Sequence, residues 1–245
     1  MSLALVFAAF WGLLAFTWVT RRQALLARGR DEWVVDLSGL LVQGAAVPLG
    51  QWVFSTWVWP ALVPGWHAAW DAPAPVAFLL DFVLVDYLYY WNHRLLHVKA
   101  LWRFHEVHHT ATAMDVLVTS RNTLFTPLLI VYFWAGGLLG FVLADPAPFA
   151  LAAALTAALD LWRHSTFAPP IGSGAHRALA TVLITPHEHA WHHSRSAVEV
   201  NFGANLSLWD RLHGSYAKAD AAPEALGVER QGALWRPFLF PGPTR

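Results

Sequence analysis

The sequence contains no cysteine, and charged residues make up only 13% of its 245 positions. The absence of cysteine excludes disulfide bonds and excludes thiolate ligands for a metal ion. The formal net charge is zero and no polybasic segment is present, so we expect no binding of nucleic acid. A chain with so few charges lacks the solvated surface of an ordinary soluble domain.

Apolar and aromatic residues are correspondingly abundant. Hydrophobic residues make up 56% of the chain, which includes 15 Trp and 15 Phe, and the mean hydropathy is +0.40. Several uncharged runs approach the length needed to cross a bilayer. We therefore predict an integral membrane protein in which residues 1–245 form a single membrane domain.

The apolar runs predict an all-α bundle of about four to five transmembrane helices. They cover residues 3–20, 34–59, 75–91, 124–143 and 147–162. The second run is interrupted by polar residues, including Asp36, and by Pro48, so a kinked or re-entrant path remains an alternative to a single span. The polar segments between and after the runs are expected to form a helical cap on one side of the membrane.

The distribution of Lys and Arg predicts which side that is. The loops at residues 60–75 and 143–147 contain neither residue, so the positive-inside rule assigns the opposite side to the cytoplasm. The same topology puts the histidine-rich segments on that cytoplasmic side. Arg exceeds Lys and Ala is abundant, as in proteins from GC-rich bacteria. We therefore predict a bacterial cytoplasmic membrane protein whose active site faces the cytoplasm.

Histidine is the polar residue in excess, with 13 copies against 16 Lys plus Arg. A helix places residues four apart on one face, which pairs His93 with His97 and His105 with His109. His108 points about a third of a turn away from the second pair, so the H-x-x-H-H triplet can offer rings to two different metals.

The same triplet returns later in the chain. His189, His192 and His193 repeat the spacing, and Asp160 and His164 are four apart at the end of the last apolar run. A zinc site uses about three or four protein ligands, so nine rings indicate two metal ions. The candidate ligands are His93, His97, His105, His108, His109, His164, His189, His192 and His193.

Other polar residues near these rings are candidates for hydrogen bonds to a ligating histidine, because such partners orient the ring and select its tautomer. For Asp210, which lies in the run Trp209-Asp210-Arg211, we favour a role in starting and packing a helix, and a bond to a histidine is the alternative. His67 falls on the opposite side of the membrane and is interpreted as an interfacial residue. His176 and His213 lack spaced partners and are interpreted as structural. The candidate partners are Asp86, Tyr90, Asp160, His187 and Asp210.

Two other classes compete with a two-metal oxidase. The stretch His105-Glu106-x-x-His109 matches the zinc metalloprotease motif H-E-x-x-H, in which Glu is the general base, but a protease leaves His93, His97 and the second triplet unexplained. A metal transporter is expected to carry ionisable residues midway along its spans, whereas these histidines follow the ends of the spans. An all-nitrogen, thiolate-free set suits iron and oxygen chemistry, and imidazole also suits zinc, copper and nickel.

A family resemblance narrows these alternatives. The motifs HRLLH, FHEVHH, TPHEHAWHHS and NFGANLSLWDRLHGSY resemble, in this order, those of the fatty acid hydroxylase / sterol desaturase superfamily of membrane histidine-box di-iron enzymes. The resemblance covers about residues 80–216, the catalytic region. Two positions depart from the pattern: Thr166 stands where the family often has Asn, and Phe202 where it often has Tyr.

The resemblance implies an O2-dependent oxidoreductase of lipid metabolism that hydroxylates or desaturates a C–H bond of a sterol-like, fatty acyl or ether lipid. It implies two iron ions as cofactors, with zinc as a substitute in purified protein, and the nine histidines as their ligands. The chain shows no dinucleotide-binding motif and no spare length for a haem domain, so we expect electrons to come from a separate ferredoxin- or cytochrome-type donor with an NAD(P)H reductase.

The helical faces also predict how the nine rings divide between the metals. We expect His93, His97, His105 and His109 at one metal, and His164, His189 and His193 at the other. The middle residues of the two triplets are expected to cross over. His108 would join the second metal, and His192 would join the first.

Overall fold

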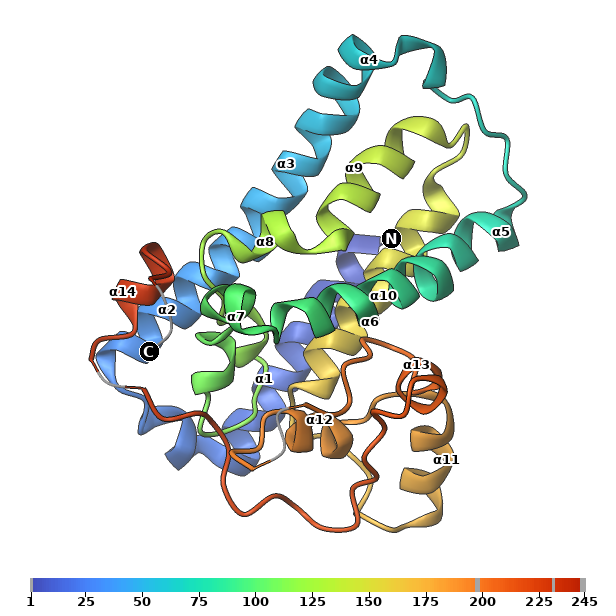
Figure 1. Cartoon of the computed structure of the whole chain (residues 1–245). Helices are drawn as coiled ribbons and strands as arrows, with labels where there is room; N and C mark the ends of the chain where they lie inside the picture. Colours follow the sequence, from blue (N-terminus) through green and yellow to red (C-terminus); the bar gives the residue numbers. More distant parts are fainter. Residues whose placement is uncertain (1, 197–198, 231, 243–245) are drawn as a thin grey trace.

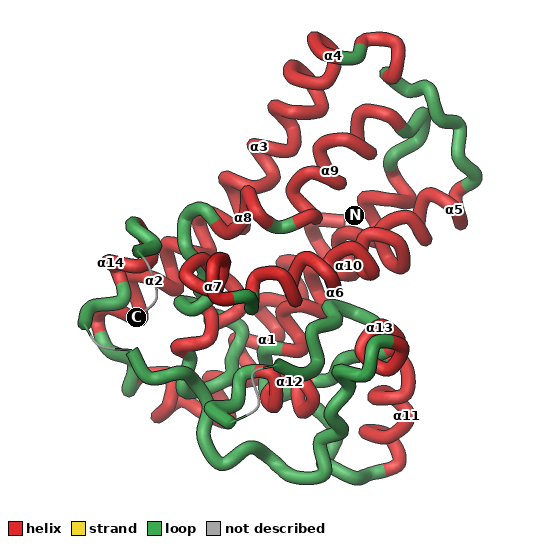
Figure 2. The backbone as a smooth tube through the Cα atoms, in the orientation of Figure 1, coloured by secondary structure: helices red, strands yellow, loops and turns green. Residues whose placement is uncertain are grey.

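The computed structural model describes residues 2–196, 199–230 and 232–242, and in these ranges the chain is helical with no strand (Figure 2). Pairing of the extended type is limited there to isolated bridges, such as the one between Trp70 and Leu143. The all-α fold class predicted from the apolar runs is therefore confirmed.

Within these ranges three helices are long and apolar enough to cross a membrane, at Leu3–Leu26, Arg30–Leu62 and Ala74–Leu96. The first is α1 (Ser2–Leu26), which bends at Arg21, where the backbone leaves helical geometry. At a rise of about 1.5 Å per residue, each helix exceeds the roughly 30 Å of a hydrocarbon core. The bundle therefore has the dimensions of an integral membrane protein.

The second and third helices are continuous but contain π-helical turns. The second joins α2 (Arg30–Leu41), η1 (Val42–Ala46), α3 (Val47–Val53), η2 (Phe54–Val58) and α4 (Trp59–Leu62). The third joins α5 (Ala74–Leu79), η4 (Leu80–Val85) and α6 (Asp86–Leu96). The polar and proline interruptions of the second run thus change the helical pitch without turning the chain back, which removes the re-entrant alternative.

The fourth apolar run differs from the prediction of one span over residues 124–143. The structure forms the short α8 (Thr126–Leu129), an extended residue at Ile130, and then α9 (Val131–Val142). Twelve residues span about 18 Å, so α9 is shorter than the hydrocarbon core. The helix α10 (Ala147–Arg163) follows. With α9 as a shorter fourth, the described part of the chain has three to four apolar helices that could span a membrane, at the lower end of the predicted four to five.

The helices pack into a bundle whose outer surface is apolar. α10 lies against both α1 and α5, and α3 lies against α9 (Figure 1). Leu13 and Leu161 belong to one buried cluster between these elements, and Val85 and Phe149 belong to another. Large apolar side chains on α1 stay exposed, including Trp11 at 61%. In a bilayer such a surface contacts lipid instead of water.

The two ends of the bundle have different characters. At one end, the loops that lack Lys and Arg meet, because Ala68 N donates to Phe141 O and Ala144 N donates to Trp70 O, each at 3.0 Å. At the other end lie short helices that carry most of the histidines (Figure 1). They are α7 (Lys99–His105), η5 (His108–Thr110), η6 (Val118–Ser120), α11 (Gly174–Val182), α12 (Pro186–His192) and α13 (Leu208–Leu212). A last short helix, α14 (Trp235–Leu239), packs on α2.

Candidate metal centre

Nine histidines converge in two groups at the end of the bundle. The candidate ligand atoms of each group lie within 4.8 Å of one another. The first group contains His93, His97, His105, His109 and His192, and the second contains His108, His164, His189 and His193. This is the division expected from the helical faces, with His108 and His192 exchanged between the two triplets. That the rings bind metal remains a prediction.

Five separate elements bring these rings together. His93 lies in the last turns of α6, and His97 follows that helix directly. His105 ends α7, and His108 and His109 begin η5. His164 follows the last residue of α10, and α12 carries His189 and His192, with His193 directly after its end. Short helices with ends that meet at one point can therefore place rings from distant parts of the sequence in direct contact.

Backbone carbonyls orient four of the rings through Nδ1. A neutral ring that donates Nδ1–H to a carbonyl leaves the Nε2 lone pair free to bind a metal. The pairs are His93 with Phe202 O at 2.8 Å, His108 with Arg121 O at 3.2 Å, His164 with Asp160 O at 2.8 Å and His192 with Val200 O at 2.7 Å. The chain thus holds both groups in the tautomer that a metal requires.

The facing nitrogens of His108 and His164 show what the second group is suited to hold. Their Nε2 atoms are 3.2 Å apart, and each ring already uses its Nδ1 proton for a carbonyl. Two lone pairs therefore face each other, an arrangement that needs a cation between them. Nitrogens bound to one metal at about 2.0–2.1 Å lie about 3.0–3.4 Å apart. The observed separation has the spacing of two ligands of a common ion.

Further ring contacts have the same spacing. Nε2 of His189 is 3.0 Å from Nε2 of His164 and 3.2 Å from Nε2 of His193. In the first group, the Nε2 atoms of His93 and His105 are 2.9 Å apart. Buried polar atoms normally have a hydrogen-bond partner, yet several ring nitrogens here have none. They belong to His97, His105, His109, His189, His192 and His193. The donor set therefore fits two metal ions.

Burial keeps the rings neutral, as metal ligands must be. Desolvation lowers the pKa of His105, His108 and His109 well below the ordinary value of 6.5. It lowers the pKa of His97 to about 3. Because the charged form of each ring is disfavoured, the chain offers lone pairs instead of positive charge at neutral pH.

This burial predicts that the metal-free protein is acid-labile. Below pH 6.5 the histidines of the unfolded chain bind protons, whereas the buried rings of the folded chain stay neutral. The free energy of unfolding therefore falls as the pH falls. For His97 the decrease extends from pH 6.5 to about 3, at about 1.4 kcal/mol per pH unit for one group. We expect the unfolding temperature of the metal-free protein, followed by tryptophan fluorescence, to drop steadily between pH 7 and pH 5. A temperature that stays constant over this range would contradict the burial of the rings.

Asp86 and Tyr90 lie on the face of α6 that carries His93, but neither contacts a ring nitrogen of the nine. The Asp86 carboxylate is fully buried and accepts from Asn205 N at 2.8 Å, from Leu206 N at 3.2 Å and from Trp209 Nε1 at 2.7 Å. Asp86 therefore acts on the site indirectly, by fixing residues 202–206, whose first carbonyl accepts from His93.

Tyr90 and the other candidate partners act at different places. The Tyr90 hydroxyl bonds to Ser215 Oγ at 2.9 Å. Asp210 accepts from Phe202 N at 2.8 Å and Gly203 N at 2.7 Å, so it fixes the same segment as Asp86. Asp160 is the one candidate with a direct ring contact, because its backbone oxygen accepts from His164 Nδ1 at 2.8 Å and its carboxylate lies 3.2 Å from the same nitrogen.

The remaining histidines lie outside the two groups. His187 makes no hydrogen bond to the nine rings. Its Nε2 donates to Pro169 O at 2.8 Å. Buried His176 contacts the Glu188 carboxylate at 3.3 Å. The ring of His213 stacks on Tyr90 with a centroid distance of 5.1 Å. His176 and His213 thus have the packing roles expected of them.

Sequence reasoning missed the residues that support the rings from outside the motifs. No sequence motif marks Arg121, whose carbonyl accepts from His108. In the sequence, Asp36 is an acidic residue that interrupts an apolar run. A carboxylate in such a run needs a cationic partner, and this signal points to a buried Arg such as Arg121. The choice of a backbone carbonyl as ring acceptor leaves no trace in the residue types.

A segment near the C-terminus ties the two triplets together. Gly227 N donates to His193 O at 3.0 Å, and Val228 N donates to His109 O at 2.7 Å. The Arg230 guanidinium reaches the Glu106 carboxylate at 2.5 Å. Gly227 has a φ of +81°, and a Cβ on it would lie 2.8 Å from Ala111 O. The close approach of this segment to the histidines therefore requires glycine.

We expect Gly227→Ala to weaken the closure of the centre. A left-handed backbone with a side chain costs about 1–3 kcal/mol, and the contact with Ala111 O adds to it. Gly172→Ala is the matched control, because Gly172 has a φ of +75° and open space around its Cβ position. The unfolding temperature should fall further for Gly227→Ala than for Gly172→Ala. Equal decreases would show that the contact at Ala111 is unimportant.

Comparison with known proteins supports the resemblance seen in the motifs. A family model for fatty acid hydroxylase matches residues 78–215, more than half of the chain. The ornithine lipid hydroxylase OlsE of Rhizobium tropici is 34% identical over 69% of this chain and 51% of its own length. The alkylglycerol monooxygenase of Xenopus tropicalis is 27% identical, over 60% of this chain and 31% of its own length. The fatty acid hydroxylase vlmA of a Lecanicillium species is 30% identical, over 60% and 44%.

These relatives are longer than the part that is shared. The chain spans about half of their length or less. No solved structure matches the chain. The match of the family model nevertheless contains all nine clustered histidines, from His93 to His193. The chain therefore belongs to the fatty acid hydroxylase family.

Proposed function

We propose that this protein is a membrane di-iron oxygenase that hydroxylates or desaturates a C–H bond of a lipid. The observation that carries the proposal is the pair of Nε2 lone pairs of His108 and His164, which face each other at 3.2 Å. That pair and the two ring groups support two metal sites with all-nitrogen ligands. Iron suits such a set when O2 is the co-substrate.

The lipid substrate is inferred from the bundle and from the relatives. In the described part of the chain three helices are apolar enough to cross a bilayer, and His93 and His97 lie at the end of the third. The relatives named above are an ornithine lipid hydroxylase, an alkylglycerol monooxygenase and a fatty acid hydroxylase. A lipid with a long chain and a polar head, held in the membrane, is therefore the substrate class that we propose.

The protein's own residues would orient and shield the reaction. Bound iron would supply the activation of O2, which attack on an unactivated C–H bond requires. The carbonyls of Phe202, Arg121 and Val200 hold the rings in one tautomer. Eight of the nine rings are buried and His97 is partly buried, which limits the access of water to the site. Phe202 packs edge-on to His97 with a centroid distance of 5.0 Å and adds an apolar wall.

Reducing equivalents must come from outside the chain. Hydroxylation places one atom of O2 in the C–H bond and reduces the other to water, which consumes two electrons and two protons. We propose a separate ferredoxin- or cytochrome-type donor with an NAD(P)H reductase. We also propose that the centre faces the cytoplasm of a bacterial cell, because the loops at the opposite end of the bundle lack Lys and Arg.

Isotope labelling of lipids tests the proposed activity. The iron-loaded protein in nanodiscs of bacterial lipid extract would be supplied with a ferredoxin, its reductase, NADPH and 18O2. Mass spectrometry should then detect a lipid that gains one labelled oxygen atom or, for desaturation, loses two hydrogen atoms without labelling. The same nanodiscs under argon are the control. A fully iron-loaded protein that consumes electrons without changing any lipid would overturn the proposal.

The zinc protease alternative makes a different prediction at Glu106. Its carboxylate pairs with Arg230 instead of being free to activate water. A partly exposed ion pair contributes about 0–1 kcal/mol, so we expect Glu106→Gln to retain lipid oxidation within about fivefold. A protease would lose its general base and nearly all of its activity. Peptide hydrolysis that wild type performs and that Glu106→Gln loses at normal metal content would therefore favour the protease.

A further inference from the structure

The carbonyl that orients His108 belongs to a segment that the second membrane helix holds in place. Arg121 O accepts from His108 Nδ1 at 3.2 Å. The Arg121 side chain is almost fully buried, at 1% exposure, and it points toward the first turns of α2. Its position therefore determines where the acceptor for His108 lies.

Asp36 in α2 binds that guanidinium with both carboxylate oxygens. Arg121 Nε donates to Oδ1 at 2.6 Å, and Arg121 Nη2 donates to Oδ2 at 2.8 Å. Asp36 is completely buried, and Glu32 accepts from Arg121 Nη1 at 3.2 Å. A two-pronged contact of this kind fixes direction as well as distance.

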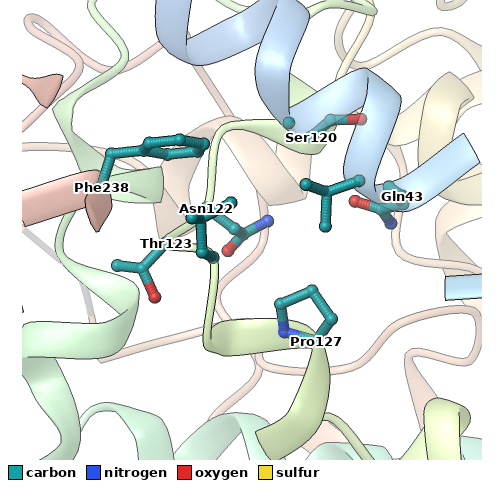
Figure 3. A pocket seen from close by; sticks show the side chains of 9 residues that line it. Gln43, Ser120, Asn122, Thr123, Pro127 and Phe238 are labelled. Carbon is teal, nitrogen blue, oxygen red and sulfur yellow. The ribbon is translucent and has the colours of Figure 1, made fainter. Parts of the chain in front are cut away.

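A second contact, one helical turn further along α2, holds the preceding peptide. A Cβ on Gly39 would lie 1.9 Å from Ser120 O, so helix and peptide touch directly at this position. Figure 3 shows the small pocket beside this contact, which Gln43 of η1 lines together with Ser120, Asn122 and Thr123. Asp36 and Gly39 thus hold Ser120 and Arg121 from the same face of α2.

Both helix residues lie outside residues 78–215, the part matched by the family model. We propose that Asp36 is a positioning residue for the second metal group: through Arg121 it fixes the carbonyl that keeps His108 Nε2 directed at His164. The inference rests on the proposed function, because it assumes that this group binds a metal. The prediction is that loss of Asp36 weakens one of the two metal sites and spares the other.

Asp115 provides a matched control in the same network. Arg28 donates to Asp36 at 3.1 Å and to Asp115 at 2.5 Å, and both carboxylates are buried. Asp36 contacts Arg121, whereas the bonds of Asp115 go to Arg28 and to Leu117 N. Asp36→Asn and Asp115→Asn therefore each remove one buried negative charge that contacts Arg28. Of the two, only Asp36→Asn also removes the partner of Arg121, whose carbonyl accepts from His108.

The test is a titration of the full-length metal-free protein in detergent with Co(II), whose visible absorption reports nitrogen coordination. Wild type should bind two Co(II) per chain. Asp36→Asn should bind one with unchanged affinity and the other about 10–100-fold more weakly, the usual effect of losing an outer partner of a ligand. Asp115→Asn should bind both like wild type. Unfolding temperatures of the two variants show whether they are equally folded.

Each outcome has a definite meaning. Two tight sites in Asp36→Asn, or the same selective loss in Asp115→Asn, would overturn the positioning role and leave the proposed function standing. Failure of wild type to bind two Co(II) would overturn the proposed function itself. If Asp36→Asn does not fold, Arg121→Lys replaces it, because Lys keeps the charge and loses the two-pronged contact. Two tight sites in Arg121→Lys would equally overturn the inference.

Discussion

Replacement of His108 by Ala is expected to abolish lipid oxidation and to remove one metal ion from the protein. His108 belongs to the second ring group and faces His164 at 3.2 Å. Even groups that merely orient a metal ligand contribute about 10–100-fold to affinity or activity. Loss of the ligand itself should therefore lower activity by more than about 100-fold. Metal analysis and labelled lipid products measure the two effects.

His213→Phe is the control for this substitution. The His213 ring stacks on Tyr87 and Tyr90, and its Nε2 has no hydrogen-bond partner, so a phenyl ring should replace it with little effect. Membrane insertion should be normal in both variants. Near-normal activity in His108→Ala would remove His108 from the ligands and would contradict the proposed second metal site.

Asp86→Ala is expected to unfold the end of the bundle that carries the histidines. The substitution leaves Asn205 N, Leu206 N and Trp209 Nε1 without their acceptor. A buried unsatisfied donor costs about 1–3 kcal/mol, so three of them approach the whole stability of a typical domain, about 5–15 kcal/mol. We expect little folded protein after purification, and a large decrease of the unfolding temperature in what remains.

Asp81→Asn is the control for Asp86→Ala. It shows whether loss of a different buried carboxylate in the same membrane helix also lowers the unfolding temperature. Asp81 is also buried, but the donor to its carboxylate is Thr156 Oγ1, and an amide oxygen can still accept that bond. Its unfolding temperature should stay close to that of wild type. If Asp86→Ala were as stable as Asp81→Asn, the hydrogen bonds to residues 205–209 would be unimportant for the fold.

Residue spacing was sufficient to predict how the nine rings divide. Positions four apart share a helical face, so the pairing of His105 with His109 and the crossing of His108 to the other group follow from local geometry alone. The structure places the rings in those two groups. The spacing succeeds because the second triplet lies in α12 and the residue that follows it. The first triplet runs from the end of α7 into η5 through Glu106 and Val107, which keep helical backbone angles.

The apolar pattern of a segment was not sufficient to predict where its helices begin and end. The run at residues 124–143 contains no charged residue, and the residue types next to Ile130 do not mark it as the extended position. That break depends on neighbours, because Asn92 accepts from Val131 N and donates to Leu129 O. The side chain of another helix thus provides hydrogen bonds on both sides of the interruption. A contact of this kind is invisible in the run that it interrupts.

The sequence by itself determined the class of the protein: apolar runs of bilayer length, an excess of histidine at i, i+3 and i+4 spacing, and no thiolate. These are properties of residue type and short-range order. The tertiary structure decided what holds the rings. Phe202 O, Arg121 O and Val200 O became acceptors because Asp210, Asp36 and other buried groups position their segments. Every residue has a carbonyl, so only the folded chain determines which ones face a histidine.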